Sequence, residues 1–177
     1  IKTIEDTLQI QDENLIIKAV NAIMKADRVH FFGSGGSAIV ALDAYHKFIR
    51  SGINANADLD SHLQIMSASQ MKDKDLAVLI SLSGSTKDLL DISQVLKNNK
   101  VPILAITNFA KSYLAERADI ALYTVADETD FRLEVLSSRI AQLSIIDALY
   151  TNVMILRKEL GRCALQKMRE SVSLKHL

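Results

Sequence analysis

Apolar residues recur at two different periods along the chain. Steps of three and four residues, as at Leu15, Ala19, Ala22 and Ile23, are typical of one face of a helix. Short continuous apolar runs, such as LAVLISL at 76–82, have the length of a buried strand. The two patterns alternate. We therefore expect helices at 12–26, 37–50, 61–70, 86–97, 112–117 and 132–160, and strands at 29–32, 53–58, 76–82, 103–107 and 120–125.

Strands that are apolar throughout and separated by helices indicate a parallel sheet covered on both faces. The expected fold is α/β, a doubly wound domain with a five-stranded parallel sheet flanked by helices. The expected segments are a leading helical segment at 1–28, the α/β domain at 29–160 and a C-terminal tail with helical character at 161–177. Gly161 stands where the last long helix is expected to end.

The composition favours one cytoplasmic domain. With 177 residues, 49% of them hydrophobic, the chain can bury a core without disulfides, and its single cysteine, Cys163, fits a reducing compartment. Twenty-one basic and 21 acidic residues give no net charge, which argues against nucleic-acid binding by this segment. No apolar run approaches the roughly 18–20 residues of a membrane span, so we expect no membrane partner. Because the chain starts at Ile1 rather than methionine, we expect a longer protein.

Four of the six glycines lie in two loops, each directly after an apolar strand and before a helix. The loops are GSGGS at 33–37 and SLSGST at 81–86. At the carboxyl ends of parallel strands, helix N-termini present free N–H groups, which favour an anion such as phosphate. Glycine allows close approach of the backbone, and the hydroxyl groups can donate to oxyanions. We predict a phosphate site here; the alternative interpretation is two ordinary turns with Ser or Thr caps.

Other ligand classes fit these residues less well. The first loop carries Ala38 instead of the third glycine of a dinucleotide fingerprint, and the second loop lacks the lysine of a P-loop. The four histidines and Cys163 show no metal-ligand spacing. We therefore expect neither a cofactor nor a metal.

The loops resemble those of a known family. SLSGST is similar to the Ser-x-Ser-Gly-x-Thr signature of sugar isomerase (SIS) domains, and Gly33-x-Gly35-x-Ser37 resembles their other phosphate loop. Across the whole chain the resemblance is to the C-terminal effector domain of RpiR-type transcription regulators. It is carried by FFGSGGSAIVALDAYHKFIRSG, Asp60-Ser61-His62, AITNFAKSYLAERADIALYT and SSRIAQLSIIDALYTNV.

The resemblance implies a SIS-type, flavodoxin-like fold and a set of ligand contacts. The implied phosphosugar-binding residues are Ser34, Gly35, Ser37, Ser81, Ser83, Gly84, Ser85 and Thr86. The implied sugar contacts are Glu134, Arg139, Gln142 and His62. It further implies a homodimer or tetramer, and DNA binding only through an N-terminal helix-turn-helix domain that would precede residue 1.

Two functions follow from the resemblance. SIS isomerases use a glutamate on the helix after the fifth strand as a base, and here Gln142 aligns with that position. An amide cannot serve as a base, so we expect a phosphosugar-sensing domain that controls carbohydrate metabolism genes and is not an enzyme. The alternative is a free-standing phosphosugar isomerase, for example a 6-phospho-3-hexuloisomerase, with Glu134 as the candidate catalytic residue.

Overall fold

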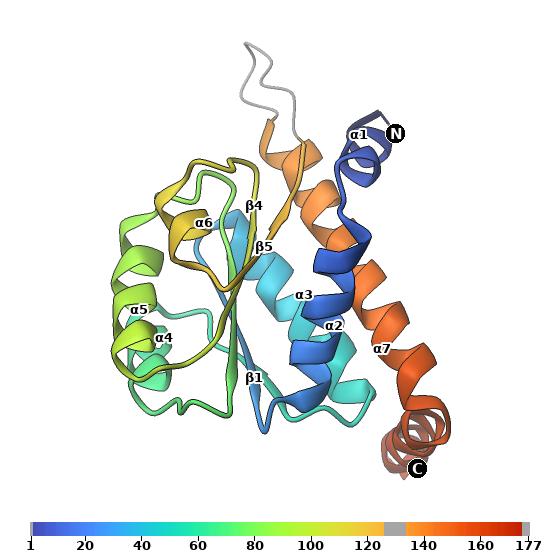
Figure 1. Cartoon of the computed structure of the whole chain (residues 1–177). Coiled ribbons are helices and arrows are strands. Elements are labelled where there is room, and N and C mark those ends of the chain that lie inside the picture. Colours follow the sequence, from blue (N-terminus) through green and yellow to red (C-terminus); the bar gives the residue numbers. More distant parts are fainter. Residues whose placement is uncertain (1, 126–133, 175–177) are drawn as a thin grey trace.

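The structure, a computed structural model, describes residues 2–125 and 134–174, with side chains from residue 137 onward in the second range. These residues form seven helices and five strands (Figure 1). The elements are α1 (Lys2–Gln9), α2 (Glu13–Lys25), β1 (Val29–Gly33), α3 (Gly36–Arg50), β2 (Ala55–Ala57), α4 (Ser61–Ser69), β3 (Leu76–Ile80), α5 (Lys87–Asn98), β4 (Ile103–Thr107), α6 (Tyr113–Arg117), β5 (Ile120–Tyr123) and α7 (Glu134–Ser173).

The five strands form one parallel sheet in the order β2-β1-β3-β4-β5. This is the flavodoxin-like order, and it confirms the expected doubly wound fold. After β1 the chain crosses through α3 to β2, whereas after β3 it crosses through α5 to β4, on the opposite side of the sheet (Figure 1). In such sheets the point where the winding direction reverses is the usual ligand site. Here that point lies between β1 and β3.

Successive strand residues point into two separate cores. Phe31 packs with α2, α3 and α7, whereas its neighbour Phe32 packs with α4, α5 and α6. Figure 1 shows the same division, with α2, α3 and α7 on one side of the sheet and α4, α5 and α6 on the other. All five positions of β1, β3 and β4 are buried. This double burial explains why these strands are continuous apolar runs in the sequence.

The predicted start of the leading helix is confirmed. Asp12 is the N-cap of α2, and its Oδ1 accepts a hydrogen bond from the backbone N–H of Asn14 at 2.8 Å. A separate helix, α1, precedes it and was not predicted. The hydroxyl of buried Thr7 accepts from the backbone N–H of Val125 at 3.0 Å, and the Gln11 amide donates to the carbonyl of Tyr123 at 2.7 Å. These contacts attach the leading segment to the end of β5.

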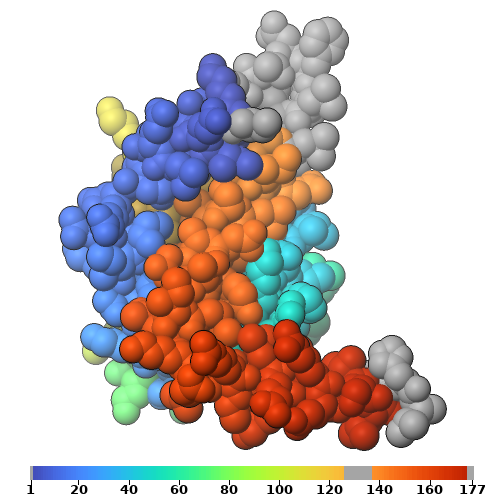
Figure 2. Space-filling model, turned by 90° about the vertical axis from the view of Figure 1, so that its right-hand side faces the viewer, coloured from blue at the N-terminus to red at the C-terminus, as the bar shows by residue number. Residues whose placement is uncertain are grey.

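The expected helix stop at Gly161 is wrong. Helix α7 continues to Ser173, and its break lies at Lys158, whose φ of 42° and ψ of −116° are non-helical. A Cβ atom at Gly161 would lie 3.1 Å from Cε of Met154, so this glycine lets the two segments of α7 approach each other closely. Beyond the break, the C-terminal segment projects from the body of the molecule (Figure 2).

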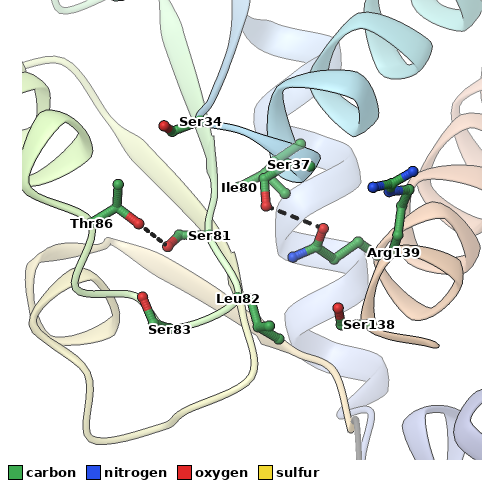
Figure 3. Close-up of a pocket in the computed structure, with 11 residues that line it drawn as sticks. Ser34, Ser37, Ile80, Ser81, Leu82, Ser83, Thr86, Ser138 and Arg139 are labelled. Atoms are coloured by element: carbon green, nitrogen blue, oxygen red, sulfur yellow. Dashed lines mark hydrogen bonds between the residues drawn. The ribbon is translucent and has the colours of Figure 1, made fainter. Parts of the chain in front are cut away.

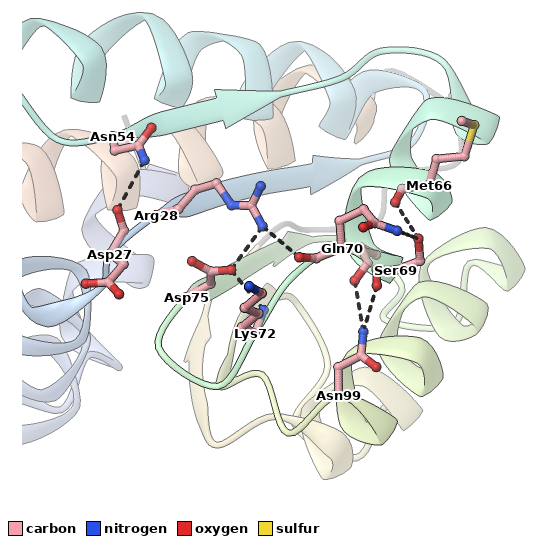
Figure 4. A network of polar contacts seen from close by, with 10 residues as sticks. Asp27, Arg28, Asn54, Met66, Ser69, Gln70, Lys72, Asp75 and Asn99 are labelled. Atoms are coloured by element: carbon pink, nitrogen blue, oxygen red, sulfur yellow. Dashed lines mark hydrogen bonds and ion pairs between the residues drawn. The ribbon is translucent and has the colours of Figure 1, made fainter.

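A polar cluster lies at the amino ends of the strands (Figure 4). Nη2 of Arg28 lies 3.0 Å from Oδ2 of Asp75 and donates to the carbonyl of Gln70 at 3.3 Å. The same carboxylate oxygen accepts from the backbone N–H of Lys72 at 2.9 Å. The cluster fixes the turn before β3 against the start of β1.

A search of the described helices for a membrane span finds none with the necessary length and apolar character.

Candidate functional site

A cavity of about 250 Å³ opens at the carboxyl ends of β1 and β3 (Figure 3). These strands end level with each other, because Gly33 pairs with Ile80 in the sheet register. The cavity is therefore at the reversal point of the winding. Its lining residues are Ser34, Gly36, Ser37, Ile80, Ser81, Leu82, Ser83, Thr86, Ser138, Arg139 and Gln142.

Two helices begin at this cavity without a side-chain cap. The N-caps of α3 and α5 are Gly35 and Thr86, and neither makes a side-chain cap hydrogen bond. In contrast, Asp12, Asp60 and Ser112 cap α2, α4 and α6 through their side chains. The first N–H groups of a helix need partners from outside the helix. At the cavity an anion can be that partner, and the positive end of each helix dipole favours it.

The second loop holds its hydroxyl oxygens in place through the backbone. Oγ of Ser81 accepts from the backbone N–H of Gly84 at 3.0 Å, and Oγ of Ser83 accepts from that of Ser85 at 3.2 Å. Oγ of Ser81 also lies 3.2 Å from Oγ1 of Thr86. Each serine oxygen thus accepts from the loop, while its own hydrogen can still be donated. The loop presents donors of fixed position.

Two glycines set the shape of the loops. Gly35 has a φ of +56°, in a region where residues with a Cβ atom are rare. Gly84 has a φ of +62°, and a Cβ there would lie 2.2 Å from Oγ of Ser112 and 2.9 Å from Oγ1 of Thr107. The backbone of the second loop therefore packs directly on the last residue of β4 and on Ser112, which caps α6. Neither glycine lines the cavity itself.

Helix α7 forms the remaining wall, with one cation and one amide. Arg139 is the one charged residue among the described residues that line the cavity, and its buried Nε has no hydrogen-bond partner. Gln142 is 2% exposed. Its Oε1 accepts from Oγ of Ser37 at 3.4 Å, while its buried Nε2 has no partner. Among the side chains that the structure describes, this wall offers unused hydrogen-bond donors and no carboxylate.

The structure brings together most of the predicted site residues. Those that line the cavity are Ser34, Ser37, Ser81, Ser83, Thr86, Arg139 and Gln142. Gly35, Gly84 and Ser85 belong to the same loops but do not line it, and Ser85 faces a separate surface depression. His62 is exposed on the first turn of α4, outside the cavity lining. The side chain of Glu134 lies outside the described residues.

Sequence reasoning missed some lining residues. Gly36, Ile80, Leu82 and Ser138 also line the cavity. Three of them are sequence neighbours of predicted residues at the two loops, namely Gly36, Ile80 and Leu82. Ser138 directly precedes Arg139 on α7, and this adjacency is the one signal that would have found it.

The buried histidine lies away from the cavity. His30 is fully buried in β1, stacked on Phe32 with ring centroids 4.2 Å apart, and its Nε2 lies 3.3 Å from Oδ2 of Asp58. Burial lowers the pKa of His30 to about 4, against the opposing effect of the Asp58 carboxylate. Within residues 2–125 and 137–174, no group of His, Cys, Asp and Glu side chains could hold a metal ion.

Curated proteins of similar sequence include transcription regulators. An HTH-type transcriptional regulator of Caldanaerobacter subterraneus is 37% identical over 149 residues, which cover 84% of this chain and 53% of the regulator. The HTH-type transcriptional regulator RpiR of Escherichia coli is 31% identical over 167 residues, or 94% of this chain and 56% of RpiR. The chain therefore spans a little more than half the length of these curated relatives.

A solved structure shares the fold over nearly all of the chain. The Vibrio vulnificus NanR protein, complexed with ManNAc-6P, superposes with a TM-score of 0.89 at 26% identity, covering 97% of this chain and 64% of NanR. A family model described as the SIS domain matches residues 22–152. The chain belongs to the SIS domain family, and within it resembles RpiR-type transcription regulators.

Proposed function

We propose that this chain is the phosphosugar-sensing effector domain of an RpiR-type transcription regulator that controls carbohydrate metabolism genes. The observation that carries the proposal is the cavity at which α3 and α5 begin without side-chain caps, facing fixed hydroxyl groups. Similarity to HTH-type regulators and to NanR, whose structure holds ManNAc-6P, supports it.

Local groups must attract the phosphate, because the chain as a whole has no net charge. A phosphate ester carries about −1.5 to −2 charges at pH 7. The two helix N-termini and the Arg139 guanidinium supply positive potential at the cavity, and the described lining contains no carboxylate that would oppose it. Binding should accordingly depend on the phosphate group more than on the sugar.

The lining residues favour a sensor over an isomerase. Moving a proton between adjacent carbons of a sugar requires a base. Gln142 is an amide, and among the cavity-lining residues that the structure describes there is neither a carboxylate nor a histidine. Glu134 is the candidate base if turnover is found. We propose that the chain is not an enzyme.

The remaining half of the relatives' length leaves room for a DNA-binding domain. We propose that DNA contact is made only by a helix-turn-helix domain preceding this chain, in the cytoplasm, and that the effector domain forms a homodimer or tetramer. Two-fold assembly would place two such domains on a palindromic site. Sugar occupancy would then change DNA affinity by a coupling free energy, typically about 1–3 kcal/mol.

Isothermal titration calorimetry with matched sugars and sugar phosphates tests the proposal. We expect at least one phosphosugar to bind, its unphosphorylated counterpart not to bind, and inorganic phosphate to compete weakly. Equal affinity for a sugar and its phosphate would contradict a phosphate-directed site.

The question of catalysis needs a separate measurement. Incubation with aldose and ketose phosphates in deuterium oxide, followed by NMR, reports exchange at the carbon next to the carbonyl. We expect no exchange above background. Exchange that disappears in Glu134→Gln would show that the protein is an isomerase.

A further inference from the structure

The α7 wall of the cavity carries two hydrogen-bond donors that no described residue of the protein pairs with. Nε of Arg139 and Nε2 of Gln142 are both buried, and neither has a partner within the described residues. Buried polar groups in folded proteins are nearly always paired, so two neighbouring exceptions in one cavity indicate a missing partner. Because both atoms are donors, that partner must be an acceptor.

The Gln142 amide contacts Ser37. The serine hydroxyl donates to Oε1 of Gln142 at 3.4 Å, so the amide oxygen already has a partner. In Figure 3 a dashed line from Ser37 marks this hydrogen bond. In this arrangement the amide presents its NH₂ group to the cavity.

The described lining offers a ligand no carboxylate acceptor. It consists of hydroxyl groups, backbone, two apolar residues, one amide and one guanidinium. The serine and threonine hydroxyl groups of the lining can meet sugar hydroxyl groups, which both donate and accept, whereas the two unpartnered groups on α7 can only donate. A carboxylate only accepts, and a guanidinium matches it with two parallel N–H groups.

From these contacts we infer that the effector is a phosphorylated sugar acid, whose carboxylate accepts from Arg139 and Gln142 while its phosphate occupies the N-termini of α3 and α5. The inference rests on the proposed function, because it assumes that the phosphate binds at the two loops. It adds the chemistry of the other end of the effector and assigns Gln142 as the residue that determines specificity.

Calorimetry with pairs of ligands that differ only at the first carbon tests the inference. Glucose 6-phosphate against 6-phosphogluconate, and ribose 5-phosphate against 5-phosphoribonate, keep the phosphate and chain length constant. We expect the acid of at least one pair to bind about tenfold or more tightly than its aldose, since a hydrogen bond to a charged group is worth about that much. If both members bind equally, or the aldoses bind better, the inference is wrong while the proposed function stands. If no phosphorylated compound binds, the proposed function fails first.

Two substitutions at Gln142 separate this role from general effects. Gln142→Glu replaces the NH₂ donor by an acceptor of nearly the same shape, and should lower affinity for the sugar acid about tenfold more than it lowers affinity for the aldose phosphate. Gln142→Met removes the donor without adding charge, and should reduce the preference for the acid, of which Arg139 retains a part. The matched control is Gln94→Glu, the same exchange on the exposed face of α5, which should leave both affinities unchanged. A folded Gln142→Met variant with an undiminished preference for the acid would overturn the inference.

Discussion

Arg28 and Arg139 lie at opposite ends of the sheet and have opposite surroundings. Arg28, at the amino end of β1, pairs with Asp75 at 3.0 Å and also donates to a backbone carbonyl (Figure 4). Arg139, at the carboxyl end, has no carboxylate beside it in the described lining of the cavity (Figure 3). Where the protein supplies the counter-charge, the arginine serves the fold. Where it does not, the arginine is available to a ligand.

The largest expected effect is a loss of stability at low pH, caused by the buried His30 near Arg28. Because the folded pKa of His30 is about 4, below the ordinary value of 6.5, the unfolded chain takes up the proton first as the pH falls. The contribution to stability is therefore complete above pH 6.5 and is lost down to pH 4. We expect His30 to lower the free energy of unfolding by about 2.5 kcal/mol between pH 7 and pH 4.5.

Urea denaturation at both pH values measures this loss. A His30→Gln variant should show a correspondingly smaller difference between the two pH values. An unchanged pH dependence in that variant would show that other groups are responsible.

Breaking the ion pair at the amino end should affect stability alone. Asp75→Ala leaves the partly buried Arg28 without its counter-charge and removes the acceptor for Lys72 N–H, and we expect a loss of about 2 kcal/mol in unfolding free energy. Affinity for phosphosugars should remain within twofold. The control is Asp73→Ala, an exposed residue of the same turn, expected to change stability by less than about 0.5 kcal/mol. A selective loss of binding in Asp75→Ala would contradict the separation of the two ends.

The converse substitution should affect binding alone. Arg139→Met keeps the aliphatic bulk but removes the charge and the unpartnered donor, so affinity for phosphosugars should fall about tenfold to thirtyfold. Unfolding free energy should stay the same or increase, because a buried donor without a partner is lost. Calorimetry measures the affinity, and thermal unfolding measures the stability. A destabilised variant with intact affinity would mean that Arg139 has a structural role like that of Arg28.

The smallest effect concerns two serines in the same loop. Ser83 lines the cavity, whereas Ser85 does not. Ser83→Ala should weaken phosphosugar binding about tenfold, and Ser85→Ala by less than about twofold, since its backbone is retained. Equal losses in both variants, measured by calorimetry, would show that the loop conformation matters more than the individual hydroxyl.

Much of the fold could be predicted because local signals agree with tertiary packing. The helical spacing after Asp12 predicted α2, and the apolar run at 76–82 predicted β3. Helix α1 could not be predicted, since its attachment depends on Thr7 contacting Val125, 118 residues away. The break of α7 at Lys158 carries no glycine or proline signal, and Gly161 marks close packing instead.

The site was predictable where it consists of loops that follow strands. Ser34, Ser37, Ser81 and Ser83 are found by their position after β1 and β3. The backbone conformation of a loop decides which of its side chains face the cavity. The positive φ of Gly84 is part of that conformation, and no spacing rule predicts that Ser85 lies outside the lining. Ser138 comes from a helix more than 50 residues later in the chain, so its approach depends on how α7 packs.

The double core has a consequence for how such a domain can change. Nearly every strand side chain is committed to one of two cores, whereas most cavity residues follow the strands or lie on α7 and belong to neither. Exchanging a hydroxyl or an amide at this edge therefore requires no repacking of the interior. A domain of this architecture can pass from one ligand to another, or from recognition to turnover, through a few substitutions while its folding information is left intact.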